Sequence, residues 1–234
     1  SGFDIVSGGE LARVIAAGGD PARIVFSGVG KTAPEMEAAL TAGIRCFNVE
    51  SASEFERLSD VAGSVGRRAP GSKRVNPDVD AKTHPYISTG LKKSKFGIGA
   101  DRALEEFDTA GKLPHIKVVG VHSHIGSQLT QVTPFVDALK KAIALIQTLQ
   151  SKGVHIQYLN IGGGLGITYS DETPPHPKEL AEAISPLLQT VSCQIIMEPG
   201  RSIVGNAGIL VTKVLYNKDG ANKRFVIVDA AMND

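Results

Sequence analysis

The chain of 234 residues has no tryptophan and only two cysteines, Cys46 and Cys193, each inside an apolar stretch. Two cysteines in such surroundings do not form a disulfide framework and are typical of buried thiols in a reducing compartment. A disulfide-stabilised secreted protein is therefore disfavoured, and we expect a cytoplasmic protein.

A strong charge of one sign is also missing, because 25 Lys and Arg balance 24 Asp and Glu to a net charge of +1. No field over the whole chain would attract nucleic acid or an anionic membrane surface. No apolar run approaches the roughly 20 residues of a membrane helix, and the opening SGFDIVSGGEL lacks the basic and apolar segments of a signal peptide. We expect neither nucleic acid nor a membrane as a partner.

The 42% of residues that are hydrophobic follow two alternating patterns. Short runs rich in β-branched residues predict seven strands: FDIVS, ARIVFSG, CFNVES, SKRVNP, IKVVGVHSH, YLNIGGG and IIMEPGR. Between them, three segments open on the S/T-x-x-E signature of a helix start: Ser7 with Glu10, Thr32 with Glu35 and Ser51 with Glu54. The longest helix is predicted from about Thr133 to Lys152, before the helix stop at Gly153.

Strands that are apolar on both faces predict a parallel sheet covered by helices, either open and doubly wound or closed as a (β/α)8 barrel. Polar residues or glycines lie at or near the carboxyl ends of six predicted strands, which favours the barrel: Asp4, Ser51, Arg74, His124, Gly162 to Gly164, and Glu198. A closed barrel needs eight strands. We therefore expect residues 1–205 to form a TIM-type α/β barrel that lacks its first strand.

The alternation of predicted strands and helices ends after Arg201. The stretches at 208–218 and 223–231, joined by KDGAN, predict a β-hairpin. Two strands alone are not stable in water. We therefore expect residues 206–234 to begin a second, β-type domain that is truncated here.

Gly162, Gly163 and Gly164 follow the strand YLNI, so their N–H groups can turn towards an anion with no Cβ in the way. If one strand precedes the chain, YLNI and IIME are the seventh and eighth barrel strands, whose following loops commonly bind phosphate. The alternative is a glycine-rich turn that serves only tight packing.

Glu198-Pro199-Gly200-Arg201 places a carboxylate and a guanidinium at the end of the last predicted strand. They could form a structural ion pair. Alternatively, the carboxylate could hold a heteroaromatic nitrogen protonated, which makes the ring an acceptor of electrons.

His122 and His124 share one face of a strand, because side chains alternate with period two. Two histidines in this arrangement could ligate zinc in a hydrolase, or form ordinary hydrogen bonds in the core. A third possibility is that one imidazole lies flat on a cofactor ring whose phosphate meets Ser127.

Five motifs together resemble the diaminopimelate decarboxylases, pyridoxal-phosphate enzymes of fold type III related to ornithine decarboxylase and alanine racemase: VHSHIGSQL, NIGGGLGI, EPGRSIVGNAG, RVNPDVDAKTHPYISTGLKKSKFGI and FVIVDAAMND. The resemblance covers essentially the whole chain. It implies decarboxylation of meso-2,6-diaminopimelate to L-lysine and CO2, the last step of lysine biosynthesis, by a homodimer in the cytoplasm, or in the plastid if the source is a plant or alga. An ornithine or arginine decarboxylase is the alternative within this family; a metal-dependent barrel hydrolase and a non-catalytic pyridoxal-phosphate carrier are alternatives outside it.

The resemblance also implies roles for individual residues. His124 would stack on the pyridoxal ring, and Glu198 would pair with the pyridine nitrogen. Ser127 and the backbone of Gly162, Gly163 and Gly164 would bind the phosphate. The cofactor site would extend over Pro199 and Gly200 to Arg201, which would also hold the distal carboxylate of the substrate. A supporting group would consist of Asp4, Arg74 and Lys95.

One expected residue has no counterpart. The lysine that links covalently to the cofactor belongs to the missing first strand, and Lys31 and Lys95 match other positions of the family. We therefore expect this chain to be a fragment that is inactive by itself.

Overall fold

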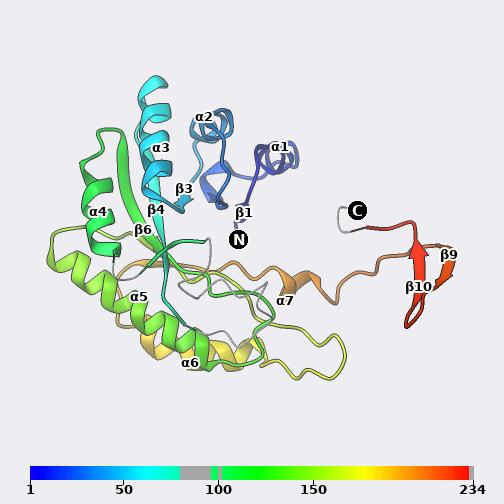
Figure 1. Ribbon diagram of the computed structural model, residues 1–234. Coiled ribbons are helices and arrows are strands. Elements are labelled where there is room, and N and C mark those ends of the chain that lie inside the picture. The colour runs from blue at the N-terminus through cyan, green and yellow to red at the C-terminus, as the bar shows by residue number, and fades with distance from the viewer. Residues whose placement is uncertain (80–95, 100–101, 232–234) are drawn as a thin grey trace.

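The computed structural model describes residues 1–79, 96–99 and 102–231. Strands and helices alternate along most of the chain, as the hydrophobic pattern predicts (Figure 1). The elements of the first half are β1 (Phe3–Ile5), α1 (Gly8–Ala16), η1 (Pro21–Arg23), β2 (Ile24–Phe26), α2 (Ala33–Ala42), β3 (Cys46–Val49), α3 (Ala52–Ser64), β4 (Ala69–Asn76) and β5 (Ile98–Gly99). Those of the second half are α4 (Ala103–Lys112), β6 (Ile116–His122), α5 (Thr133–Ser151), β7 (Tyr158–Asn160), α6 (Pro177–Leu188), β8 (Gln194–Ile196), α7 (Arg201–Val204), β9 (Val214–Asp219) and β10 (Arg224–Val228).

Serine caps start two of the helices directly after a strand. Ser7 Oγ accepts a hydrogen bond from the N–H of Glu10, and Ser51 Oγ accepts one from the N–H of Glu54, both at 3.2 Å. Each glutamate also accepts from the backbone N–H that precedes the cap, at Val6 and Glu50. The expected signature is therefore present, and it also fixes the backbone between strand and helix.

The sheet is parallel and curled, with the strand order β1-β2-β3-β4-β6-β7-β8 and the short β5 attached to β4. Figure 1 shows helices α1 to α6 in an arc outside these strands. The seven strands on this path are the seven predicted ones, and the expected barrel class, short of one strand, is confirmed.

Helices cover the outer face of the sheet with two large apolar clusters. One contains Phe26, Phe47 and Phe55 beneath the first three helices, and the other contains Ile146 and Leu159 beneath the later ones. The predicted helix at 133–152 is present as α5, and its apolar stripe supplies much of the second cluster. Because helices occupy the outer face, the polar residues of the strands are left on the inner face.

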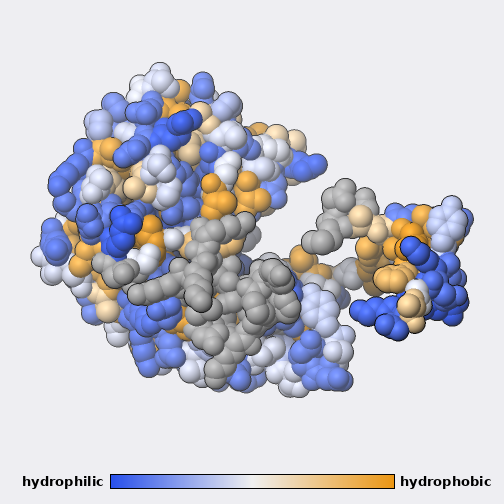
Figure 2. Space-filling model, viewed as in Figure 1, coloured by the Kyte–Doolittle hydropathy of each residue, from blue (hydrophilic) through white to orange (hydrophobic). Residues whose placement is uncertain are grey.

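The C-terminal segment forms the predicted antiparallel hairpin, β9 with β10. It stands apart from the sheet at the end of an extended stretch (Figure 1), in which Ile209 is 91% exposed. Figure 2 shows apolar side chains gathered on the side of the hairpin that faces the rest of the chain. Among the described residues, no helix combines the length and apolar character needed to cross a membrane.

Candidate functional site

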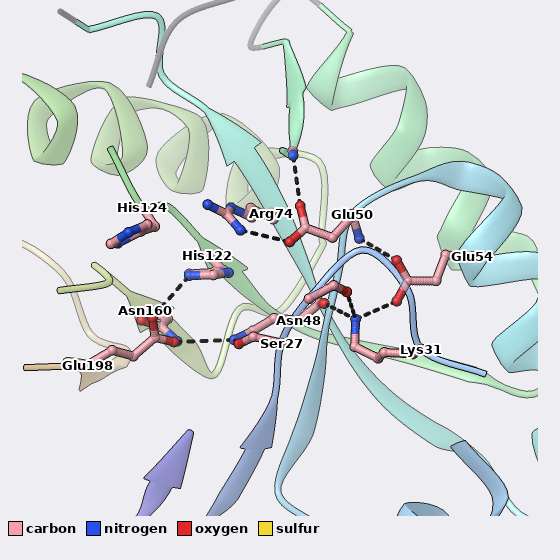
Figure 3. Close-up of polar contacts among 12 residues, drawn as sticks. Ser27, Lys31, Asn48, Glu50, Glu54, Arg74, His122, His124, Asn160 and Glu198 are labelled. Carbon is pink, nitrogen blue, oxygen red and sulfur yellow. Dashed lines mark hydrogen bonds and ion pairs between the residues drawn. The ribbon is translucent and has the colours of Figure 1, made fainter. Parts of the chain in front are cut away.

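The inner face of the sheet collects polar residues where the strands end. Alternation sends Phe26, Phe47 and Leu159 outwards into the helix layer, so their strand neighbours point inwards. The inward set comes from strands far apart in sequence and meets at one end of the sheet (Figure 3): Ser27, Asn48, Glu50, Arg74, His122, His124, Asn160 and Glu198.

Glu198 is the centre of this cluster. Its Oε1 accepts hydrogen bonds from Asn160 Nδ2 at 2.6 Å and from Asn48 Nδ2 at 3.4 Å, and its Oε2 lies 3.6 Å from His122 Nε2. Burial by itself would raise the pKa of Glu198, but its interactions with His122, Asn160 and His124 outweigh burial and lower this pKa to about 2. The side chain is therefore an ionised carboxylate at neutral pH.

Asp4 is a second carboxyl group in the same cluster. Its Oδ1 forms a 2.7 Å hydrogen bond with Ser27 Oγ, which also accepts from Asn48 Nδ2. Desolvation and then the negative charge of Glu198 raise the pKa of Asp4 to about 7. The surroundings thus keep Glu198 ionised, whereas they make Asp4 bind its proton more tightly.

The glycine turn after β7 lies against the chain segment that carries Glu198. The N–H of Glu198 donates to the carbonyl oxygen of Gly162 at 2.9 Å, and a Cβ on Gly163 would collide with the carbonyl oxygen of Glu198. Gly162 and Gly164 have φ values of +69° and +110°. Close packing in left-handed backbone therefore accounts for these glycines by itself, and phosphate binding is an additional hypothesis.

His124 connects β6 to this turn. Its Nδ1 accepts a hydrogen bond from the N–H of Gly163 at 3.3 Å, which requires an unprotonated Nδ1. Desolvation and then the positive charge of Arg74 lower the pKa of His124 to about 4. His124 is therefore a neutral imidazole at neutral pH, partly exposed to the site.

Arg74 and Arg201 are the two arginines among the expected site residues. Arg74 is buried near the end of β4 and donates to Glu50 Oε1 at 2.7 Å. Arg201, the first residue of α7, donates to Gln128 Oε1 at 3.4 Å and stacks on Tyr169. Arg201 thus contacts Gln128 and Tyr169, and the structural ion pair between Arg201 and Glu198 that the sequence allowed does not form.

Three of the remaining expected residues lie in the segments that follow β6 and β8. Ser127 is partly buried in the bend after Gly126, and Pro199 and Gly200 are exposed between β8 and α7. Ser51, in contrast, is occupied as a helix cap. Lys95 lies outside the described residues.

The zinc hypothesis has no ligand set in the part of the chain that the structure describes. There, no three side chains of His, Cys, Asp or Glu form a group that could hold a metal ion. His122 is instead directed at Glu198.

Sequence analysis missed Asn48 and Asn160, which hold the carboxylate of Glu198 in place. A signal was available, because each asparagine belongs to a short and mostly apolar run that predicts a buried strand, CFNVES and YLNIGGG. Buried amides require hydrogen-bond partners, so their positions already pointed to a polar cluster.

Comparison with known proteins adds a second line of evidence. Residues 1–205 match the family model described as "Pyridoxal-dependent decarboxylase, pyridoxal binding domain". The chain is 57% identical over 235 residues to diaminopimelate decarboxylase of Vibrio cholerae, covering all of this chain and 56% of that protein.

Solved structures of diaminopimelate decarboxylases are also similar to this chain. The chain has a TM-score of 0.90 and 49% identity to diaminopimelate decarboxylase of Helicobacter pylori complexed with L-lysine, covering 100% of this chain and 59% of that one. For the M. jannaschii enzyme in complex with L-lysine the TM-score is 0.86 and the identity 41%, covering 100% of this chain and 56% of that one. The chain thus spans a little over half the length of the relatives it matches.

Proposed function

Because the chain belongs to the pyridoxal-dependent decarboxylase family, we propose that it binds pyridoxal 5'-phosphate and forms much of the active site of a meso-2,6-diaminopimelate decarboxylase. The observation that carries this proposal is the adjacency of the glycine turn and Glu198. Gly162, Gly163 and the ionised carboxylate lie within one cofactor's length, since a backbone hydrogen bond joins Gly162 to Glu198.

The residues present fit the cofactor chemically. Glu198 is kept ionised by His122 and Asn160, as a partner for a pyridinium N–H must be. His124 is a neutral, half-buried imidazole that can lie against an aromatic ring. The N–H groups of the glycine turn, with Ser127, provide donors for a phosphate.

Pyridoxal phosphate, when bound, supplies a protonated ring that accepts electrons from the bond to the leaving carboxylate. Glu198 holds the proton on the ring nitrogen, Arg74 lies at one side of the site, and the glycine turn holds the phosphate end. Arg201 has a guanidinium that can bind a carboxylate through two parallel hydrogen bonds, and we assign it the distal carboxylate of the substrate.

The proposed reaction removes CO2 from meso-2,6-diaminopimelate and yields L-lysine. Support comes from relatives that bear the name diaminopimelate decarboxylase at 57% identity and from solved relatives that hold L-lysine. The ornithine and arginine decarboxylase alternatives are not favoured by these relatives. We further propose a homodimer in the cytoplasm, with residues 1–205 as the cofactor-binding domain and residues 206–234 as the start of a β domain.

The test has two parts. Release of CO2 by the protein as its gene produces it, with meso-diaminopimelate, L-ornithine and L-arginine compared at equal concentration, should favour meso-diaminopimelate. Pyridoxamine 5'-phosphate, which has no aldehyde to react with a lysine, should bind the chain, and Glu198→Gln should weaken that binding. Equal turnover of all three amino acids would overturn the substrate assignment, and absence of binding would overturn the cofactor assignment.

A further inference from the structure

Four charged side chains, three of them buried and Glu54 partly buried, form a chain that ends at Arg74 (Figure 3). Arg74 Nη1 pairs with Glu50 Oε1 at 2.7 Å, and Lys31 Nζ pairs with Glu54 Oε1 at 2.6 Å. The two pairs are linked because Glu54 Oε2 accepts from the N–H of Glu50 at 2.8 Å. Buried ion pairs are weak evidence for stability, since their desolvation offsets their attraction.

Lys31 has its three donors fully engaged. Besides Glu54, its Nζ donates to the carbonyl oxygens of Gly28 at 2.6 Å and Asn48 at 2.7 Å. An ammonium group has three N–H donors, so none remains for a ligand. Lys31 therefore ties the ends of β2 and β3 to the start of α3, and this fixes the backbone from which Glu50 projects.

Glu50 has both carboxylate oxygens engaged. Its Oε1 accepts from Arg74, and its Oε2 accepts from the N–H of Gly97 at 2.8 Å. The Glu50 side chain is 4% exposed. A carboxylate bound at both oxygens, on a backbone held by Glu54, cannot rotate away. The guanidinium of Arg74 is in turn confined between Glu50 and the ring of Phe96, 4.7 Å from its centroid.

We infer that Glu50 is a positioning residue, which holds the guanidinium of Arg74 at the rim of the site so that Arg74 can contact the bound cofactor. This inference rests on the proposed function, because Arg74 has such a ligand only if pyridoxal phosphate binds there. Both carboxylate oxygens of Glu50 are occupied by groups of the chain itself, Arg74 and the N–H of Gly97. On this inference, the effect of Glu50 on binding passes through Arg74.

A double-mutant cycle tests this dependence. The dissociation constant of pyridoxamine 5'-phosphate is measured by fluorescence for the unmodified chain, Glu50→Gln, Arg74→Met and the double variant. Glu50→Gln should weaken binding about tenfold, because the amide cannot supply the charge that holds the guanidinium. In the Arg74→Met background the same change should alter binding by less than about twofold. Glu56→Gln, an exposed site on α3, is the control and should leave binding unchanged.

The other possible results of the cycle separate failure of this inference from failure of the proposed function. A role of Glu50 in the fold alone would weaken binding equally with and without Arg74, and this overturns the inference while the proposed function stands. If Glu50→Gln does not fold, Glu50→Asp replaces it in the cycle, since a carboxylate on a shorter side chain remains charged but cannot keep both partners. No binding of pyridoxamine 5'-phosphate by the unmodified chain overturns both the proposed function and the inference.

Discussion

At the scale of single residues, the site depends on keeping Glu198 ionised and His124 neutral while both are largely removed from water. Glu198 keeps its charge because three side chains from β3, β6 and β7 converge on it. His124 stays neutral because burial and Arg74 both disfavour the imidazolium. These are the protonation states that the proposed function requires of Glu198 and His124.

The state of His124 can be observed without any ligand. Long-range ¹H–¹⁵N spectra should show an unprotonated Nδ1 and a protonated Nε2, unchanged from pH 8 to about pH 5.5, because the pKa of His124 is lowered to about 4. The signal is assigned by its loss in His124→Gln. A titration near the ordinary value of about 6.5 would contradict the hydrogen bond from Gly163.

The charge of Glu198 predicts a dependence of stability on pH. Its pKa is lowered in the folded chain, from 4.5 to about 2. Its contribution to the free energy of unfolding is therefore present above pH 4.5 and is lost as the pH falls towards 2. Between pH 7 and pH 3 this loss should be about 2 kcal/mol by urea unfolding.

Glu198→Gln should lack this part of the loss. Glu182→Gln, on the exposed surface of α6, should behave as the unmodified chain does. Equal losses in the Glu198→Gln variant and the unmodified chain would show that the carboxylate is not stabilised in the fold.

At the scale of elements, the turn after β7 and the segment after β8 pack through their backbones. Gly163→Ala should destabilise the chain by about 2 kcal/mol or more, because the new Cβ collides with the carbonyl oxygen of Glu198. Gly200→Ala is the matched control. Gly200 has a φ of −82° and no atom within 4 Å of an added Cβ, so the change should stay within about 0.5 kcal/mol. Urea unfolding of both variants distinguishes close packing from a general need for glycine.

At the scale of the whole molecule, the curled sheet and the hairpin are joined by an extended segment. Ile209 and Val211 are 91% and 83% exposed, and Leu210 is 69% exposed. Limited digestion with chymotrypsin, followed by mass spectrometry, should therefore show cleavage after Leu210 before cleavage at buried residues of the sheet. Early cuts at the buried Leu159 or Phe47 would contradict an independent cofactor-binding domain.

Local patterns in the sequence were sufficient for the elements. Short apolar runs rich in β-branched residues and S/T-x-x-E caps depend on neighbours a few residues apart, so β1 to β8 without β5, the helix α5 and the hairpin could all be predicted. The two-residue β5 could not, because it pairs with β4 only through tertiary contact. The glycines and Glu198 were found as site candidates because both lie at strand ends.

The sequence by itself determined the alternation of strands and helices, the polar character of the strand ends and the family motifs, since all of these are written in short stretches of chain. Only the tertiary structure decided that Asn48 and Asn160 would hold Glu198, that Asp4 and Glu198 would differ in pKa, and that Glu50 would hold Arg74. These outcomes depend on distances of a few ångströms between groups up to 150 residues apart. Hydrogen bonding and charge interactions act at such distances, and no local pattern records them.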